Sequence, residues 1–213
     1  MRRNHLIFGL AMMLALISGT SCNRGAVRIP GAAGTFHPTN TGFLSEYRDD
    51  RVLYIELPVD SREDHYGEPV AASRWKACRT DAFWGEAAPQ IIRDELLHEI
   101  GRSGLFSQVV TQAPQSGHLT LHTNIRAFCS QAVGFFFIRI AGITSLEFNL
   151  REGKLSLLDD RFDRVVTDAD REYTGSSVGF IKQAMRITMS DSLRELLRTF
   201  LPMLQAAVRS SAN

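Results

Sequence analysis

The chain has 213 residues, a formal net charge of +1, 44% hydrophobic residues and 22% charged residues. This composition is typical of a globular protein and excludes an intrinsically disordered chain. The nearly neutral charge provides no basic surplus, so we expect no nucleic-acid partner. The length is sufficient for one well-packed domain.

The first residues have the pattern of an export signal. Arg2 and Arg3 precede an uncharged apolar run of 12 residues (6–17), after which small residues lead to Cys22. A helix that spans a bilayer needs about 20 apolar residues, so the pattern favours a cleaved signal peptide over a retained anchor. Removal of residues 1–21 takes away two positive charges and leaves 192 residues with a net charge of −1.

Small residues that end on a cysteine resemble the lipobox of bacterial lipoproteins, although Gly19 stands where that pattern has leucine. The resemblance implies that Cys22 carries a covalent diacylglycerol and an N-acyl chain such as palmitate, which anchors the protein to a membrane, with no other cofactor. Asn23 follows the cysteine in place of aspartate, which by the enterobacterial sorting rule implies the periplasmic face of the outer membrane. The alternative is an ordinary signal peptide cut near Ser21, with Cys22 incidental.

In chain order, the first half predicts a tether, a strand and a helix. Residues 22–50 show no hydrophobic period and are rich in Gly, Pro, Thr and Asn, so we expect a lipidated N-terminus and a flexible tether. A single domain then covers residues 51–213. It begins with a strand at 51–59 and a polar loop at 60–69. A helix follows, capped by Thr80 or Asp81 and ended by Gly101 or Gly104.

The second half predicts several strands and a final helix. Apolar and polar residues alternate at 118–128, which predicts a half-buried strand. Residues 132–150 predict one or two strands, and residues 154–168 predict a hairpin that turns at Asp159–Asp160. The last helix begins near Ser190, and Pro202 should kink or divide it. This order predicts an α+β domain with a mostly antiparallel sheet and two main helices packed on one face.

Two cysteines remain after the leader, Cys78 and Cys129, 51 positions apart. In an oxidising compartment an even pair predicts a disulfide, which would add about 4 kcal/mol in the chain-entropy model. The alternative is a pair of free, buried thiols that act as small apolar side chains.

No pattern in the sequence predicts an enzyme. The segment 175–179 matches G-x-S-x-G, but a hydrolase of that type needs a histidine after Ser177, and the last histidine is His122. His118 and His122 fall on a predicted strand, where they lie about 13 Å apart and share no metal ion. The acidic residues between 159 and 172 alternate with arginines, which favours a charged edge strand over a calcium site.

One apolar run admits two interpretations. Phe135, Phe136, Phe137 and Ile138 are consecutive, so their side chains must point to both faces of any strand. Either one face packs on the core of the sheet while the other lies under a helix, or an exposed patch binds lipid, membrane or a partner.

Two family resemblances bear on function. Asp60, Arg62 and Gly67 after the first strand resemble the start of YajG-like lipoproteins. Gly104, Phe106 and Val109, followed by an alternating strand, resemble the auxiliary lipoproteins of ABC-type transport. The second resemblance implies a partner of Mla- or Pqi-type lipid transporters without an active site.

We therefore expect a non-catalytic periplasm-facing lipoprotein that serves as an accessory or adaptor in envelope lipid transport or envelope assembly. Its expected partners are the membrane, through the lipid anchor, and an envelope complex such as a lipid ABC transporter. The alternative is a lipid-binding or membrane-contacting protein that uses the apolar segment 133–143. A periplasmic hydrolase is the remote alternative.

Overall fold

The computed structural model describes residues 39–78, 87–133, 139–167 and 178–212. The described chain forms one sheet and two helices. The elements are β1 (Asp49–Ile55), β2 (Val59–Asp60), α2 (Ala88–Ser103), β3 (Phe106–Val110), β4 (His118–Val133), β5 (Arg139–Glu152), β6 (Leu155–Thr167) and α3 (Val178–Ser211). The predicted α+β class is confirmed.

The sheet is mixed and has the order β3-β1-β4-β5-β6, with β2 paired to β4 beyond the end of β1. β4, β5 and β6 form an antiparallel meander, as the sequence predicts. β1 runs parallel to both β3 and β4, and β2 also runs parallel to β4. The sheet is therefore not purely antiparallel. Between β1 and β3 the chain passes through α2, and such a crossover connection allows the two strands to pair in parallel.

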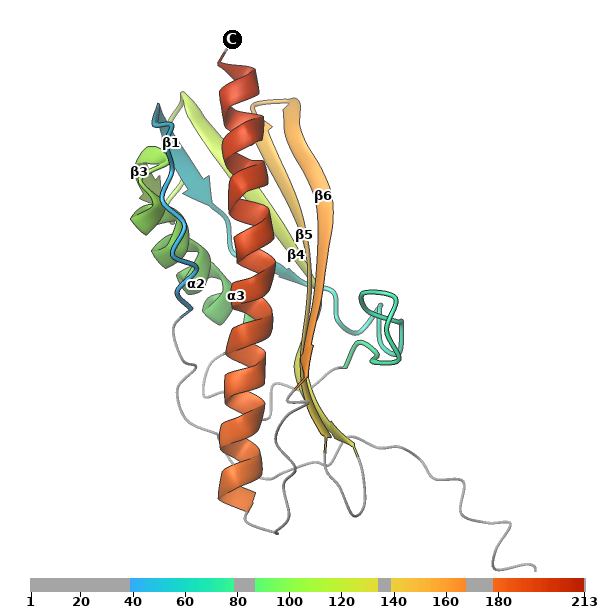
Figure 1. Ribbon diagram of the computed structural model, residues 1–213. Coiled ribbons are helices and arrows are strands. Elements are labelled where there is room, and N and C mark those ends of the chain that lie inside the picture. Colours follow the sequence, from blue (N-terminus) through green and yellow to red (C-terminus); the bar gives the residue numbers. More distant parts are fainter. Residues whose placement is uncertain (1–38, 79–86, 134–138, 168–177, 213) are drawn as a thin grey trace, which may run out of the picture.

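Both helices pack on one face of the sheet, as predicted (Figure 1). α3 lies along β5 and β6, while α2 lies over β1 and β3. On the central strand, Leu119, Leu121 and Ile125 point into this core and are fully buried. The rings of Phe148 and Phe200 stack with centroids 3.9 Å apart, which joins β5 to α3.

The backbones of α3 and β5 come into contact at Gly142. A Cβ atom built on Gly142 would lie 2.0 Å from the carbonyl oxygen of Thr188. No side chain fits in that space, so this position requires glycine for a steric reason rather than for its backbone angles.

The ends of α2 match the sequence signals in part. Gly104 follows the helix with a φ of 71°, the left-handed conformation that favours glycine at a helix end. The described helix begins at Ala88, with Pro89 in its first turn. The predicted caps Thr80 and Asp81 lie outside the described residues.

The prediction for the last helix is wrong about where the helix begins and about a division at Pro202. α3 begins at Val178 rather than near Ser190, and it continues through Pro202 without dividing. Proline removes one backbone hydrogen bond at a cost of about 3 kcal/mol. Pro202 itself is exposed, while its neighbours Phe200 and Leu201 are fully buried. Their burial outweighs the lost bond and keeps the helix continuous.

The predicted hairpin at 154–168 is also wrong. β6 runs without interruption through Asp159 and Asp160, and the chain turns earlier, at Gly153 with a φ of 58°. The two aspartates are exposed on the outermost strand of the sheet. Their polarity reflects that edge position, which a sequence pattern does not distinguish from a turn.

The tether prediction for residues 22–50 is wrong for its last part, residues 39–50. Glu95 Oε2 accepts hydrogen bonds from the backbone N–H (2.8 Å) and the hydroxyl (2.6 Å) of Thr39. One turn further along α2, Glu99 Oε2 accepts the same pair of bonds from Thr41 at 2.9 and 2.5 Å. The folded domain therefore begins by Thr39, twelve residues before the predicted boundary.

Candidate functional site

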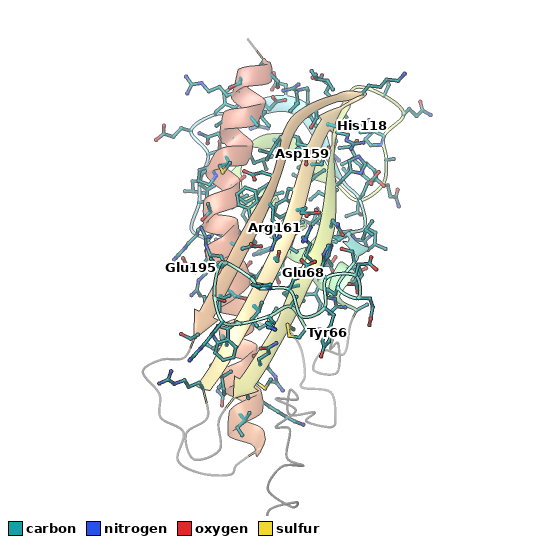
Figure 2. The ribbon with its side chains drawn as sticks, turned by 90° about the vertical axis from the view of Figure 1, so that its right-hand side faces the viewer. Tyr66, Glu68, His118, Asp159, Arg161 and Glu195 are labelled. Carbon is teal, nitrogen blue, oxygen red and sulfur yellow. A yellow bond between two sulfur atoms is a disulfide. The ribbon has the colours of Figure 1, made fainter. Side chains whose placement is uncertain are left out.

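The face of the sheet opposite the two helices, here called the outer face, carries the candidate site. Residues 61–78 form a segment, here called the cap, that crosses the outer face of the strands (Figure 2). The cap follows β2 directly, so the short pairing of β2 with β4 sets where it begins. Val70, Trp75, Ala77 and Cys78 of the cap pack on Ala127, Cys129, Ala141 and Ile143 of the sheet and form a second, smaller core.

A disulfide joins the cap to the sheet. Cys78 is bonded to Cys129 of β4, with Cα atoms 6.0 Å apart, so of the two interpretations the structure has the disulfide. Cys129 reaches the outer face because a β-bulge between Ile125 and Ala127 inserts one extra residue into β4. Such an insertion reverses which residues of a strand face which side. Without it, Cys129 would face the helices.

The three residues that resemble YajG-like lipoproteins shape the start of the cap. Arg62 is buried, pairs with both carboxylate oxygens of Asp60 at 2.6 and 2.8 Å, and donates to the Phe128 carbonyl at 3.3 Å. The hydrogen bonds from Arg62 outweigh the effect of burial and lower the pKa of Asp60. Gly67, with a φ of 83°, donates its N–H to the Ala77 carbonyl at 3.0 Å. All three residues therefore have structural roles.

Four charged or titratable side chains meet beside the cap and are here called the Arg126 cluster: His65, Glu68, Arg126 and Glu147. Arg126 of β4 donates to Glu68 of the cap at 2.9 Å and to Glu147 of β5 at 2.5 Å. Burial lowers the pKa of Arg126, but the hydrogen bonds from the two carboxylates outweigh it and raise the pKa overall. The guanidinium thus links the cap to two strands.

His65 lies within hydrogen-bond distance of two members of the Arg126 cluster. Its Nδ1 lies 3.1 Å from Glu68 Oε1 and 3.0 Å from Arg126 Nη2. A neutral ring can accept from Arg126 at this nitrogen, whereas a protonated ring donates to Glu68 and repels Arg126. The hydrogen bonds from His65 and Arg126 lower the pKa of Glu68.

The geometry does not bring the two strand histidines to a common ligand. His122 pairs with Glu56 at 2.5 Å, whereas the ring of His118 lies edge-on to Tyr54 with centroids 6.0 Å apart. Across the described ranges, no group of three or more His, Cys, Asp or Glu residues is placed to hold a metal ion. In the same ranges, neither helix has the length and apolar character needed to cross a membrane.

The predicted site residues Cys22, Phe135, Phe136, Phe137 and Ile138 lie outside the described residues, as does Ser177 of the G-x-S-x-G match, for which the sequence predicts no catalytic role. Of the wider apolar segment 133–143, the described residues Ile140, Ala141 and Ile143 are fully buried. Ile140 faces the helices, whereas Ala141 and Ile143 lie under the cap. At Ala141 and Ile143 the outer face is thus covered by the cap, whereas the two interpretations from the sequence are cover by a helix or an exposed patch.

No sequence pattern predicted the Arg126 cluster. Its members come from the cap, β4 and β5, and no short motif contains them. One signal was available, because Arg126 is the only Lys, Arg, Asp or Glu residue in the sixteen residues of β4. A single charge inside a long, half-buried strand needs a partner.

Comparison with known proteins finds solved structures with a similar fold. No family model and no curated protein matches the sequence. A crystal structure of a Xanthomonas campestris protein, described under family DUF330, is similar with a TM-score of 0.56 and 13% identity, covering 86% of this chain and 96% of that one. At this identity the likeness concerns the fold alone.

Two more distant structures have TM-scores of 0.46. A hemagglutinin homolog of Helicobacter pylori is 10% identical, with coverage of 88% of this chain and 98% of that one. A hypothetical protein of Chlamydia trachomatis is 9% identical, with coverage of 75% and 98%. Likenesses at this level imply nothing about the activity of this chain.

Proposed function

We propose that this protein is a non-catalytic lipoprotein that faces the periplasm, anchored by lipid on Cys22 to the outer membrane. In this proposal it serves as an accessory or adaptor in envelope lipid transport or envelope assembly. The structural observation that carries the proposal is the Cys78–Cys129 disulfide. Disulfides persist in oxidising compartments such as the periplasm, and the apolar leader that ends at Cys22 supports the same location.

The start of the folded domain supports an anchoring role for the N-terminal chain. Thr39 and Thr41 are held by Glu95 and Glu99, and Ser45 donates its N–H to the Ser103 carbonyl at 2.8 Å. These contacts attach the chain along α2. In this proposal the chain that leads from the anchor on Cys22 enters the domain along α2, at Thr39.

The region around the cap supports contact with another envelope protein. Leu57, Val59 and Tyr66 are large apolar side chains with exposed fractions of 53%, 66% and 59%. They lie within ten residues of one another, between the end of β1 and the start of the cap. Tyrosine is among the residue types enriched at the energetic centres of protein interfaces, and exposed apolar side chains that lie together mark interaction sites.

Co-purification from crosslinked cells tests the adaptor role. The protein is isolated in its lipidated form, and its partners are identified by mass spectrometry. We expect subunits of a lipid ABC transporter, and we expect a Tyr66→Ala, Val59→Ser variant to recover fewer of them. Recovery of no envelope protein, while the chain still fractionates with the outer membrane, contradicts the adaptor role.

Metabolic labelling with palmitate tests the anchor separately. The wild-type chain should incorporate label and fractionate with the outer membrane, whereas Cys22→Ser should do neither. Ser21→Ala keeps a small residue before the cysteine and should behave as the wild type. Equal labelling of the wild type and Cys22→Ser would overturn the assignment of Cys22.

A further inference from the structure

β6 forms one edge of the sheet. Its 13 residues pair with β5 along one side, and within the described ranges no strand pairs with its other side. β6 is the outermost strand in Figure 1, labelled at the margin of the sheet away from β1 and β3. The backbone N–H and C=O groups on the free side of an edge strand can pair with another strand.

The centre of β6 has the sequence Asp160-Arg161-Phe162-Asp163-Arg164. Phe162 and Arg164 point to the helix side, because Phe162 packs on Phe200 and Arg164 donates to the Thr199 hydroxyl at 2.5 Å. Since side chains alternate along a strand, Asp160 lies on the helix side as well. Asp163 lies on the outer face, where it accepts bonds from Ser145 at 2.6 Å and Arg161 at 2.9 Å.

We propose that two copies of this chain pair through β6, antiparallel, with Phe162 of one copy opposite Phe162 of the other. In this register each Asp160 stands opposite Arg164 of the other copy. Each Arg161 likewise stands opposite Asp163. Pairing about a two-fold axis normal to the sheet keeps the helix sides of both copies together, so all four contacts join residues on the same face.

Within the part of the chain that the structure describes, Asp160 and Arg164 on the helix side have no ion-pair partner. Among the described residues, Asp160 accepts from the backbone N–H of Arg161, and Arg164 donates to Thr199 and to the Asp163 carbonyl. None of these partners carries the opposite charge. The symmetric pairing gives each of these two side chains a countercharge that the described residues of one copy do not supply. Opposite charges directly across strands are stabilising.

The same charges disfavour other registers. If one β6 strand is shifted by two residues along the other, Arg161 of one copy stands opposite Arg161 of the other. A shift by two residues in the opposite direction places Asp163 opposite Asp163. Like charges directly across strands are destabilising. The pattern therefore protects the edge against misaligned strands while it selects one symmetric register.

α3 adds a second contact. Met203 lies one helical turn after Thr199 and therefore on the same side of α3, toward β6. Its side chain is 37% exposed. Because α3 lies along β5 and β6, the two-fold axis brings both copies of α3 side by side over the joined sheet. Met203 of each copy then meets the other helix.

Sedimentation equilibrium of the full chain in mild detergent tests the association. We expect a dimer, and we expect Asp160→Arg or Arg164→Asp alone to raise its dissociation constant at least about tenfold, because each change acts twice. The double variant restores the charge pairs and should return to within about threefold of the wild type. Asp94→Arg on the exposed side of α2 makes the same change in net charge as Asp160→Arg and should have no effect.

A monomeric wild type at about 100 μM would overturn the proposal, as would a dimer whose dissociation constant is unchanged in Asp160→Arg. Circular dichroism of each variant establishes that it is folded. The restored dimer of the double variant distinguishes pairing from a general loss of structure.

Disulfide cross-linking tests the register. Asp160→Cys chains mixed with Arg164→Cys chains should cross-link, because opposite residues of paired strands have Cα atoms about 5 Å apart. Asp160→Cys alone should not cross-link, because two copies of residue 160 would be about 13 Å apart. Gln108→Cys on the opposite edge of the sheet is the control and should stay monomeric. Cross-linking of Asp160→Cys alone as efficient as that of the mixture would overturn the register.

Discussion

The two faces of the sheet are stabilised in different ways. The helix side is one continuous apolar core in which α2 and α3 bury residues from nearly every strand. The outer face has a small core under the cap, a disulfide and a cluster of ion pairs. A large core distributes its free energy over many contacts, whereas the cap depends on a few. We infer that the cap can open while the helix side stays folded.

The largest expected loss of stability comes from a substitution on the helix side. Phe200 is fully buried and stacks on Phe148 with centroids 3.9 Å apart. Phe200→Ala should lower the free energy of unfolding by about 3–5 kcal/mol, because it removes apolar contacts and leaves a cavity. Urea denaturation measures the change. Met203→Ala, at a partly exposed position of the same helix, should cost about 1 kcal/mol or less; equal losses would contradict the described packing.

The next largest expected loss of stability comes from removal of the disulfide on the outer face. The Cys78→Ala, Cys129→Ala double variant removes the closure of a 51-residue separation and should lower the free energy of unfolding by about 2–4 kcal/mol. Reduction of the disulfide in the wild-type protein should lower the free energy of unfolding by a similar amount. A double variant as stable as the oxidised wild type would show that the bond does not constrain the cap.

A smaller effect concerns the Arg126 cluster. Arg126→Gln leaves Glu68 and Glu147 without their cation and should cost about 1 kcal/mol, because these side chains are partly solvated. A double-mutant cycle with Glu68→Gln isolates the pair between Arg126 and the cap. Arg151→Gln on the same face is exposed and should be neutral. A coupling energy of zero would mean that the pair does not hold the cap.

The pH dependence is the smallest expected effect. Hydrogen bonds and the charge of Arg51 outweigh burial and lower the pKa of Asp49, and the pKa values of Asp60 and Glu68 are also lowered. A lowered pKa in the folded state adds stability above the unfolded pKa, which is lost as the pH falls through the folded pKa. The unfolded values are 3.8 for Asp49 and Asp60 and 4.5 for Glu68. Thermal unfolding should therefore show constant stability from these groups above about pH 5.5 and a decline below pH 4.5. A rise in stability over that range would contradict the assigned pairs.

The same contrast explains what the sequence could predict. Apolar periodicity identifies the helix side, and the alternation from Leu119 to Ile125 gives the correct buried face of β4. Gly104 marks the end of α2 because a left-handed residue is needed there. These features depend on local spacing, which a sequence shows directly.

Features set by contacts between distant segments were not predictable. The bulge after Ile125 changes the side of Cys129, and no residue type signals it. The parallel pairing of β1 with β4 depends on the path of the whole chain. Thr39 and Thr41 look like tether residues until Glu95 and Glu99 are placed beside them. The Arg126 cluster likewise exists only after the cap folds over the sheet.

Hydrogen–deuterium exchange of the oxidised and reduced protein tests most directly whether the two faces are separable. We expect reduction of Cys78–Cys129 to speed exchange throughout the cap, residues 61–78, while β5 and α3 keep their protection. Faster exchange over the whole sheet and both helices would contradict it, because the cap and the helix side would then unfold as one unit. Unchanged exchange in the cap would contradict it as well, because the disulfide would then not hold the cap.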